Sequence, residues 1–300
     1  MISLENSSRE RTGMLLALLA AVGFSFKAIF VKLAYAVAPI DAVTLLSLRM
    51  VFSLPAFLWL GITASRSAPA LTQRDWFSVT ALGLLGYYGA SILDFLGLQY
   101  ISAGLERLIL FTYPTLTVLI GVLFLGRSLT RREIGALVLS YAGIALAFAH
   151  DLRLVADDRG FFLGVSLVFA SSLSYAIYLS GSAGAILRMG ATRFTALAML
   201  VSTAAVQLHF LLTHPLSSLR QPLPVYAYAF AMAVFSTVLP VFMHSLAVRH
   251  IGPAKAVLIG TLGPALTIFF GWCFLDEPLS LAQMAGMALV VIGVWQVTKK

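Results

Sequence analysis

The sequence predicts an all-α integral membrane protein in which ten transmembrane helices form two inverted five-helix repeats around a central cavity. Three observations lead to this prediction: an apolar composition, ten apolar segments and an internal repeat. Of the 300 residues, 60% are hydrophobic and only 11% are charged, and the mean hydropathy is +0.95. Such a chain has the lipid bilayer as its main solvent. A large soluble domain and a nucleic-acid-binding surface are not expected, although the net charge is +8.

Apolar segments and helix breakers place the spans along the chain. A membrane-spanning helix uses ~20 apolar residues, so ten spans leave room only for short connections. The expected spans are 13–35, 43–62, 77–98, 103–125, 134–149, 161–179, 194–212, 225–247, 254–275 and 283–297. The expected division of the chain is a cytoplasmic tail over 1–12, a first repeat over 13–150, an outer linker over 151–160 and a second repeat over 161–298.

The first span has the length of a signal-peptide core. An apolar stretch covers 14–24, and Ala34-Tyr35-Ala36 matches a small-x-small cleavage site. Lys27 and Lys32 interrupt the approach to that site, and the internal repeat needs this helix. We therefore expect the segment to remain as a membrane span.

The distribution of basic residues predicts the orientation. With a cytoplasmic N-terminus, the inner segments hold twelve lysines and arginines, whereas the outer loops hold three, Arg153, Arg159 and Arg220. Cytoplasmic loops are enriched in these residues, so both termini are expected in the cytoplasm. The four tryptophans fall near span ends, where the amphipathic indole prefers to lie.

Residues 101–143 are repeated in 251–293 without a gap. Twelve of the 43 positions are identical, including Pro114 with Pro264, where chance would give roughly four in so apolar a composition. Because each repeat holds five spans, the second copy enters the bilayer from the opposite side. Inverted copies have two arrangements of similar energy, as alternating access requires. The repeat therefore favours a transporter, with a fused structural bundle as the alternative.

The repeated stretches resemble the two EamA-type repeats of the drug/metabolite transporter superfamily. The resemblance is carried by Ala103-Gly104-Leu105 through Pro114 to Gly121, and by Gly252-Pro253-Ala254 through Pro264, Gly271 and Asp276-Glu277-Pro278-Leu279-Ser280 to Gly286 and Gly293. The first repeat departs from the family pattern, because Gly126-Arg127 stands where the second has Asp276-Glu277, and Glu106-Arg107 replaces a small or apolar pair.

The resemblance implies a ten-helix exporter of small metabolites in the bacterial inner membrane. It implies that helices 1, 3, 4, 6, 8 and 9 surround a central cavity and that helices 5 and 10 lie outside it. The sequence is also similar to the YddG-type bacterial exporters of aromatic and other amino acids. Neutral amino acids are therefore the substrates that the resemblance implies.

Seven ionised side chains lie inside the expected spans: Lys27, Lys32, Arg49, Asp94, Glu106, Arg107 and Lys255. Each is unfavourable by a few kcal/mol unless it is paired, hydrated or able to reach the interface. Lys27 lies too deep to reach the surface, so we expect it in the substrate site together with Asp94 and Glu106. Arg49 and Arg107 are expected to border the cavity as an outer gate.

A purely structural role is the alternative for these charges, with the two acids paired to the two arginines to hold helices together. In the outer half of the membrane, four of these cations stand against two acids. This excess of positive charge favours a substrate with a carboxylate over a cationic drug.

Two residues of the second repeat are expected to form an inner gate. His244 is equivalent in the repeat to Asp94, and Lys255 to Leu105, and inversion places both near the cytoplasmic end. Histidine is the side chain whose ordinary pKa lies nearest physiological pH, so His244 leaves proton coupling open. An interhelical hydrogen bond for His244 and a headgroup contact for Lys255 are the alternatives.

Aromatic residues complete the expected substrate site: Phe24, Tyr87, Tyr88, Tyr113, Tyr175 and Tyr178. A tyrosine hydroxyl in hydrocarbon needs a partner, so these rings are expected to face the interior, where they suit a moderately apolar solute. Taken singly, each of these rings is more often a packing residue than a ligand contact. Pro114 and Pro264 free backbone carbonyls inside spans and are expected to act as hinges of the gates.

The sequence lacks the motifs of a membrane enzyme. It contains no His-Glu-x-x-His, no Gly-x-Ser-x-Gly and no ATP-binding glycine loop, and the single Cys273 matches no metal-ligand spacing. We expect no catalytic residue, no cofactor and no metal. The second functional hypothesis is a proton-coupled exporter of cationic drugs or amines, in which Asp94 or Glu106 would be central. A homodimer is left open.

Overall fold

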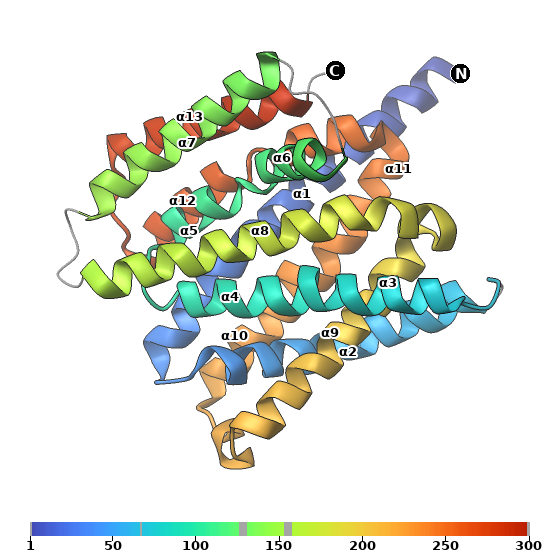
Figure 1. The fold of residues 1–300 in the computed structure, drawn as a ribbon, viewed down its shortest axis with the longest axis horizontal. Helices are drawn as coiled ribbons and strands as arrows, with labels where there is room; N and C mark the ends of the chain where they lie inside the picture. Colours follow the sequence, from blue (N-terminus) through green and yellow to red (C-terminus); the bar gives the residue numbers. More distant parts are fainter. Residues whose placement is uncertain (1, 67, 126–130, 153–157, 299–300) are drawn as a thin grey trace.

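The computed structural model describes residues 2–66, 68–125, 131–152 and 158–298, and these ranges contain helices and no β-strand (Figure 1). The helices are α1 (Ile2–Val37), α2 (Ala42–Ser65), α3 (Gln73–Gly83), η1 (Leu84–Gly89), α4 (Ala90–Gly97), α5 (Ala103–Leu110), α6 (Tyr113–Leu125), α7 (Arg131–Leu152), α8 (Asp158–Met189), α9 (Ala191–Thr213), η2 (Leu216–Leu219), α10 (Leu223–Ala233), η3 (Val234–Val238), α11 (Leu239–Gly260), α12 (Gly263–Leu275) and α13 (Leu281–Thr298). The predicted all-helical class is confirmed.

Seven helical stretches of the described chain are long and apolar enough to cross a membrane, and three apolar stretches are shorter. The seven are Glu10–Val37, Ala42–Ser65, Gln73–Gly97, Ala103–Phe124, Arg159–Met189, Ala191–Thr213 and Leu223–Gly252, and the three are Leu137–Ala147, Gly263–Leu275 and Leu281–Gly293. Residues 2–12, expected as a tail, continue α1. Half of the expected linker over 151–160, namely 153–157, lies outside the described residues.

Helices from the two halves of the chain pack against one another. α1 packs on α11 and α12, α2 packs on α9, and α4 packs on α8. The larger hydrophobic core joins first-half residues such as Phe57 and Phe95 to second-half residues such as Phe210. Because van der Waals packing between helices drives their association in a membrane, this shared core holds the two halves together.

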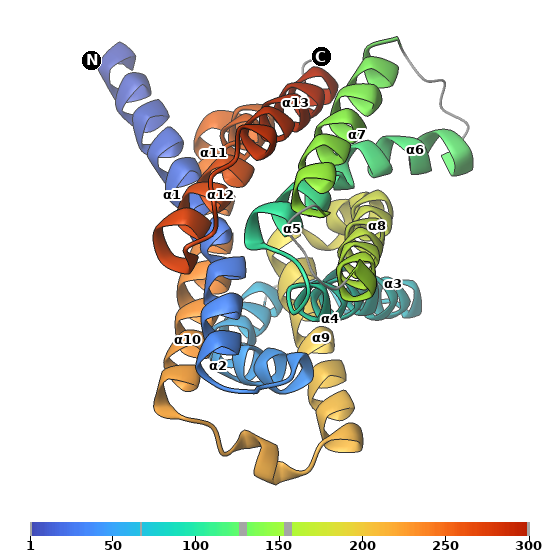
Figure 2. The ribbon, with the colours of Figure 1, turned by 90° about the vertical axis from the view of Figure 1, so that its left-hand side faces the viewer.

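α7 and α13 lie side by side at one edge of the bundle, away from α2 (Figures 1 and 2). Two glycines allow this close approach. A Cβ atom built on Gly143 would lie 2.4 Å from the carbonyl oxygen of Gly286, and one built on Gly286 would lie 2.5 Å from that of Gly143. Close backbone contact through small residues is the common mode of helix association in membranes.

The same irregularities occur twice, 150 residues apart. The π-helical turn η1 begins at Leu84, and the π-helical turn η3 begins at Val234. The break between α5 and α6 ends at Tyr113, and the break between α11 and α12 ends at Gly263. This offset is the one that aligns 101–143 with 251–293, so the backbone of the two halves departs from the regular α-helix at equivalent positions.

Candidate functional site

A cavity of about 530 Å³ lies between the two halves. Its walls come from α1, α2, η1, α4, α5 and α6 of the first half and from α8, α9, η3 and α11 of the second. No described residue of α7 or α13 lines it. The second and seventh spans, α2 and α9, were not expected in the ring of helices around the cavity. They contribute Arg49, Thr195 and Met199 to its wall.

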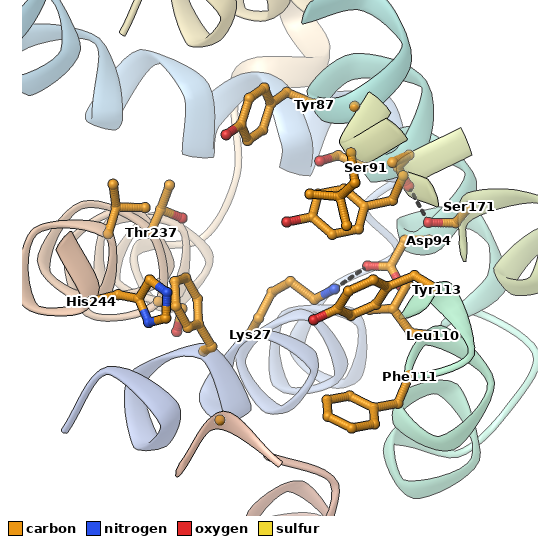
Figure 3. A pocket seen from close by; sticks show the side chains of 18 of the residues that line it. Lys27, Tyr87, Ser91, Asp94, Leu110, Phe111, Tyr113, Ser171, Thr237 and His244 are labelled. Atoms are coloured by element: carbon orange, nitrogen blue, oxygen red, sulfur yellow. Dashed lines mark hydrogen bonds and ion pairs between the residues drawn. The ribbon is translucent and has the colours of Figure 1, made fainter. Parts of the chain in front are cut away.

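One lysine at the cavity wall forms ion pairs with two carboxylates. Lys27 Nζ lies 2.6 Å from Asp94 Oδ2 (Figure 3) and 3.2 Å from Glu106 Oε1. Asp94 is 2% exposed and Glu106 is 0% exposed, and each has a second oxygen without a hydrogen-bond partner among the described atoms. Both acids thus contact Lys27, whereas the structural alternative paired them with Arg49 and Arg107.

The guanidinium of Arg49 is held from two sides. Its Nε donates a hydrogen bond to Thr237 Oγ1 at 3.1 Å, and its Cζ lies 5.5 Å from the centroid of the Phe95 ring. The Thr237 hydroxyl donates to the carbonyl of Met232 at 3.0 Å, so its lone pair is available to Arg49. Arg49 is 7% exposed, and its Nη1 has no described hydrogen-bond partner.

Arg107 reaches the same cavity from α5. Its Nε is buried without a described hydrogen-bond partner. A Cβ atom on Gly263 would lie 2.8 Å from Arg107 Nη2, so the glycine at the start of α12 makes room for the guanidinium. Two basic side chains of the first half therefore line one cavity, and each has a buried donor without a described hydrogen-bond partner.

Aromatic rings form much of the remaining wall. Phe24, Tyr87, Tyr113 and Tyr175 line the cavity, and Pro114 lies beside them. The rings of Tyr113 and Tyr175 meet edge to face with centroids 5.1 Å apart. Such rings offer apolar contact area together with a hydroxyl.

Three of the expected site residues lie behind the wall or away from it. Glu106 does not line the cavity but contacts Lys27, which does, and Tyr178 lies next to Tyr87, with their hydroxyl oxygens 3.0 Å apart. Tyr88 instead pairs with His209, its hydroxyl 3.0 Å from Nδ1.

The expected gate residues are also divided. His244 lines the cavity opposite Asp94 (Figure 3), whereas Lys255 is exposed and contacts Glu10. Pro114 lines the cavity, and the equivalent Pro264 is buried outside it.

Several small polar residues of the wall were not anticipated: Ser91, Ser171, Thr195, Ser236, Thr237 and Thr261. Serine and threonine are common in membrane helices, so their identity alone carries no signal. The repeat offset would have found some of them. Eight pairs of lining positions lie 150 apart, namely 21 and 171, 49 and 199, 86 and 236, 87 and 237, 91 and 241, 94 and 244, 110 and 260, and 111 and 261. The two residues of such a pair can differ in chemistry: Asp94, for example, is equivalent to His244.

A helical membrane bundle whose halves enclose a cavity with buried charges defines the class as a membrane transporter. The sequence profile of the EamA-like transporter family matches residues 11–149 and again residues 162–299, so the chain belongs to this family of the drug/metabolite transporter superfamily. The protein is therefore a transporter of small solutes and not an enzyme.

Two relatives from Bacillus subtilis (strain 168) support this assignment. The uncharacterized transporter YcbK is 30% identical over 288 residues, which cover 91% of this chain and 88% of the relative. The uncharacterized transporter YyaM is 24% identical over 230 residues, which cover 74% of this chain and 73% of the relative. A solved crystal structure superposes with a TM-score of 0.65 over 95% of this chain and 96% of that chain, and its 16% identity shows a shared fold alone.

Proposed function

We propose that the protein exports small metabolites, in particular aromatic and other neutral amino acids, across the bacterial inner membrane by alternating access. The observation that carries this proposal is the cavity at the seam between the halves. It combines charges of both signs with aromatic walls, and its volume of about 530 Å³ lies in the range of small-molecule sites. An amino acid has the matching chemistry, with two opposite charges on an apolar body.

The mechanism rests on ten spans arranged as two inverted repeats, over 13–150 and 161–298. The double match to the family profile supports the duplication. The π-turns and the helix breaks at an offset of 150 support it independently. An odd number of spans in each copy inverts the second copy, so the cavity can open to either side. The excess of basic residues in the alternate loops supports a cytoplasmic location for both termini.

The binding roles follow from the contacts around the cavity. Lys27 and Asp94 form the polar end of the site, with Glu106 behind them, and the rings of Tyr113 and Tyr175 take up the apolar body. Pro114 and Pro264 stand next to the helix breaks and serve as hinges. His244 faces the polar end from the opposite wall, and the gating roles fall to Arg107, which lines the cavity, and to Lys255, which contacts Glu10.

The proposal is tested with purified protein in liposomes. Labelled phenylalanine is expected to enter vesicles that contain the protein, and unlabelled neutral amino acids are expected to displace it. Repeating the measurement across an imposed pH step shows whether protons are coupled to the flux. A panel of neutral amino acids that neither enter nor compete would refute the proposal.

A second candidate is proton-coupled export of cationic drugs or amines. The observation that favours it is the buried pair Asp94 and Glu106, since two carboxyl groups that share one lysine can hold and release a proton. Displacement of label by quaternary amines, with no effect of amino acids, would select this function instead.

A further inference from the structure

The protein uses the charges around the cavity unequally. Lys27 occupies one oxygen of Asp94 and one of Glu106, whereas Arg49 and Arg107 form no ion pair with a described residue. An ammonium group that enters the cavity must compete with Lys27 for the acids. A carboxylate meets two guanidinium groups that no described carboxylate contacts.

Arg49 is prepared to bind an anion before the anion arrives. Thr237 and the Phe95 ring fix the plane of its guanidinium, and Nη1 remains buried without a described acceptor. A buried donor without an acceptor is destabilising, and a rigid guanidinium fork matches the geometry of a carboxylate. A carboxylate at this position therefore satisfies a group that the fold leaves unsatisfied.

The sum of charges points the same way. Three cations, Lys27, Arg49 and Arg107, stand against two acids, Asp94 and Glu106, among the described residues at the cavity. With both acids ionised, the group carries a single net positive charge, which one carboxylate neutralises. A zwitterion leaves that charge in place, and a cationic solute doubles it, which is unfavourable in a low-dielectric interior.

We propose that Arg49, oriented by Thr237 and Phe95, is the carboxylate-binding residue of the transporter and that the amino group of the substrate is dispensable. The transported class is then small monocarboxylates with an apolar body, of which neutral amino acids are one kind. This inference rests on the proposed function, because it takes the same cavity as the substrate site.

The first experiment compares three matched probes on the full-length protein in liposomes. Phenylpropionate lacks the amino group of phenylalanine, and phenylethylamine lacks its carboxylate. Each is tested as a competitor of labelled phenylalanine and, in labelled form, for its own uptake. Phenylpropionate is expected to compete within about threefold of phenylalanine, and phenylethylamine to compete at least about tenfold more weakly.

The outcomes separate the inference from the proposed function. If phenylalanine is carried but phenylpropionate neither competes nor enters, the inference is overturned and the proposed function stands. If phenylethylamine alone enters, both fail and amine export is favoured. If none of the three enters or competes, both fail as well.

The second experiment assigns the residue. Arg49→Gln is expected to weaken competition by phenylpropionate about tenfold or more, whereas competition by phenylethylamine should stay the same or become stronger, because one positive charge is removed. Thr237→Val keeps the charge of Arg49 but removes the acceptor that orients it. This variant is expected to weaken competition by phenylpropionate about threefold to tenfold. Arg74→Gln, on the exposed start of α3, is the matched control and should leave both affinities unchanged.

Because Arg49 is buried, the Thr237 variant decides the question if Arg49→Gln does not fold. Unchanged competition by phenylpropionate in a folded variant of either residue would overturn the assignment.

Discussion

At the scale of single residues, the unusual feature is a lysine that joins two buried acids from two other helices. Lys27 comes from α1, Asp94 from α4 and Glu106 from α5. The three side chains stabilise one another only as a set, because each is unfavourable in hydrocarbon by itself. The set therefore couples the positions of three helices to the charge of the cavity.

Lys27→Met is expected to reduce transport at least about tenfold and to destabilise the fold by about 3 to 5 kcal/mol, because it leaves two buried carboxylates without their cation. Uptake into liposomes and thermal unfolding in detergent measure the two effects. Adding Glu106→Gln to Lys27→Met removes one of the orphaned charges, so the double variant should regain stability without regaining transport. Normal transport by Lys27→Met would show that this lysine has no role in the site.

At the scale of helices, the loop after α12 holds the beginning of α5. The Glu277 carboxylate accepts hydrogen bonds from the backbone N–H of Ala103 at 2.7 Å and of Gly104 at 3.2 Å, and Ser102 Oγ accepts one from Leu105 N at 3.1 Å. The first N–H groups of a helix lack internal partners and carry partial positive charge. A residue of the second half thus caps a helix of the first half beside the cavity.

Glu277→Ala is expected to destabilise the protein by about 1 to 2 kcal/mol, since it removes a charged cap from α5. Glu277→Gln keeps an acceptor oxygen without the charge, so its stability should lie between that of Glu277→Ala and that of the natural protein. Thermal unfolding in one detergent ranks the three proteins. Equal stability of all three would show that water replaces the cap without loss.

The contact of α7 with α13 gives a second prediction at this scale. Alanine normally favours a helix over glycine by about 1 kcal/mol, but Gly286→Ala should destabilise the protein because its Cβ atom meets the carbonyl of Gly143 at 2.5 Å. Gly184→Ala is the matched control, since its Cβ atom meets only the end of the Arg188 side chain, at 3.6 Å. Thermal unfolding should shift in opposite directions for the two variants. A Gly286→Ala protein as stable as the control would refute the close packing of the pair.

At the scale of the whole molecule, polar contacts tie the two halves together at one end. Arg188 Nε lies 2.8 Å from Asp75 Oδ1, and Arg193 donates to the carbonyl of Pro69 at 2.9 Å. The turn from α2 to α3 and the turn from α8 to α9 therefore lie at the same end of the bundle (Figure 1). The turn from α2 to α3 follows the second span of the first repeat, whereas the turn from α8 to α9 follows the first span of the second repeat. Two such turns lie at the same end only if the second repeat is inverted.

Thiol labelling tests the inversion directly. Single cysteines at Ala70 and Thr192, both exposed, should react with an impermeant maleimide from one face of the membrane, and a cysteine at Ser217 should react from the other. The background is Cys273→Ser, because Cys273 is exposed. Labelling of Ala70→Cys and Thr192→Cys from opposite faces would exclude inverted repeats.

The sequence by itself determined the helical class, the apolar stretches and the residues whose charge has no place in lipid, because hydrophobicity and charge belong to each residue wherever it lies. It also contained the offset of 150 that separates the two π-turns and the paired wall positions of the structure. Only the tertiary structure decided the partners. Tyr87 and Tyr88 are neighbours of the same type, yet one lines the cavity and the other pairs with His209. Partners depend on which helices meet and how each is rotated, and these follow from the packing of the entire chain.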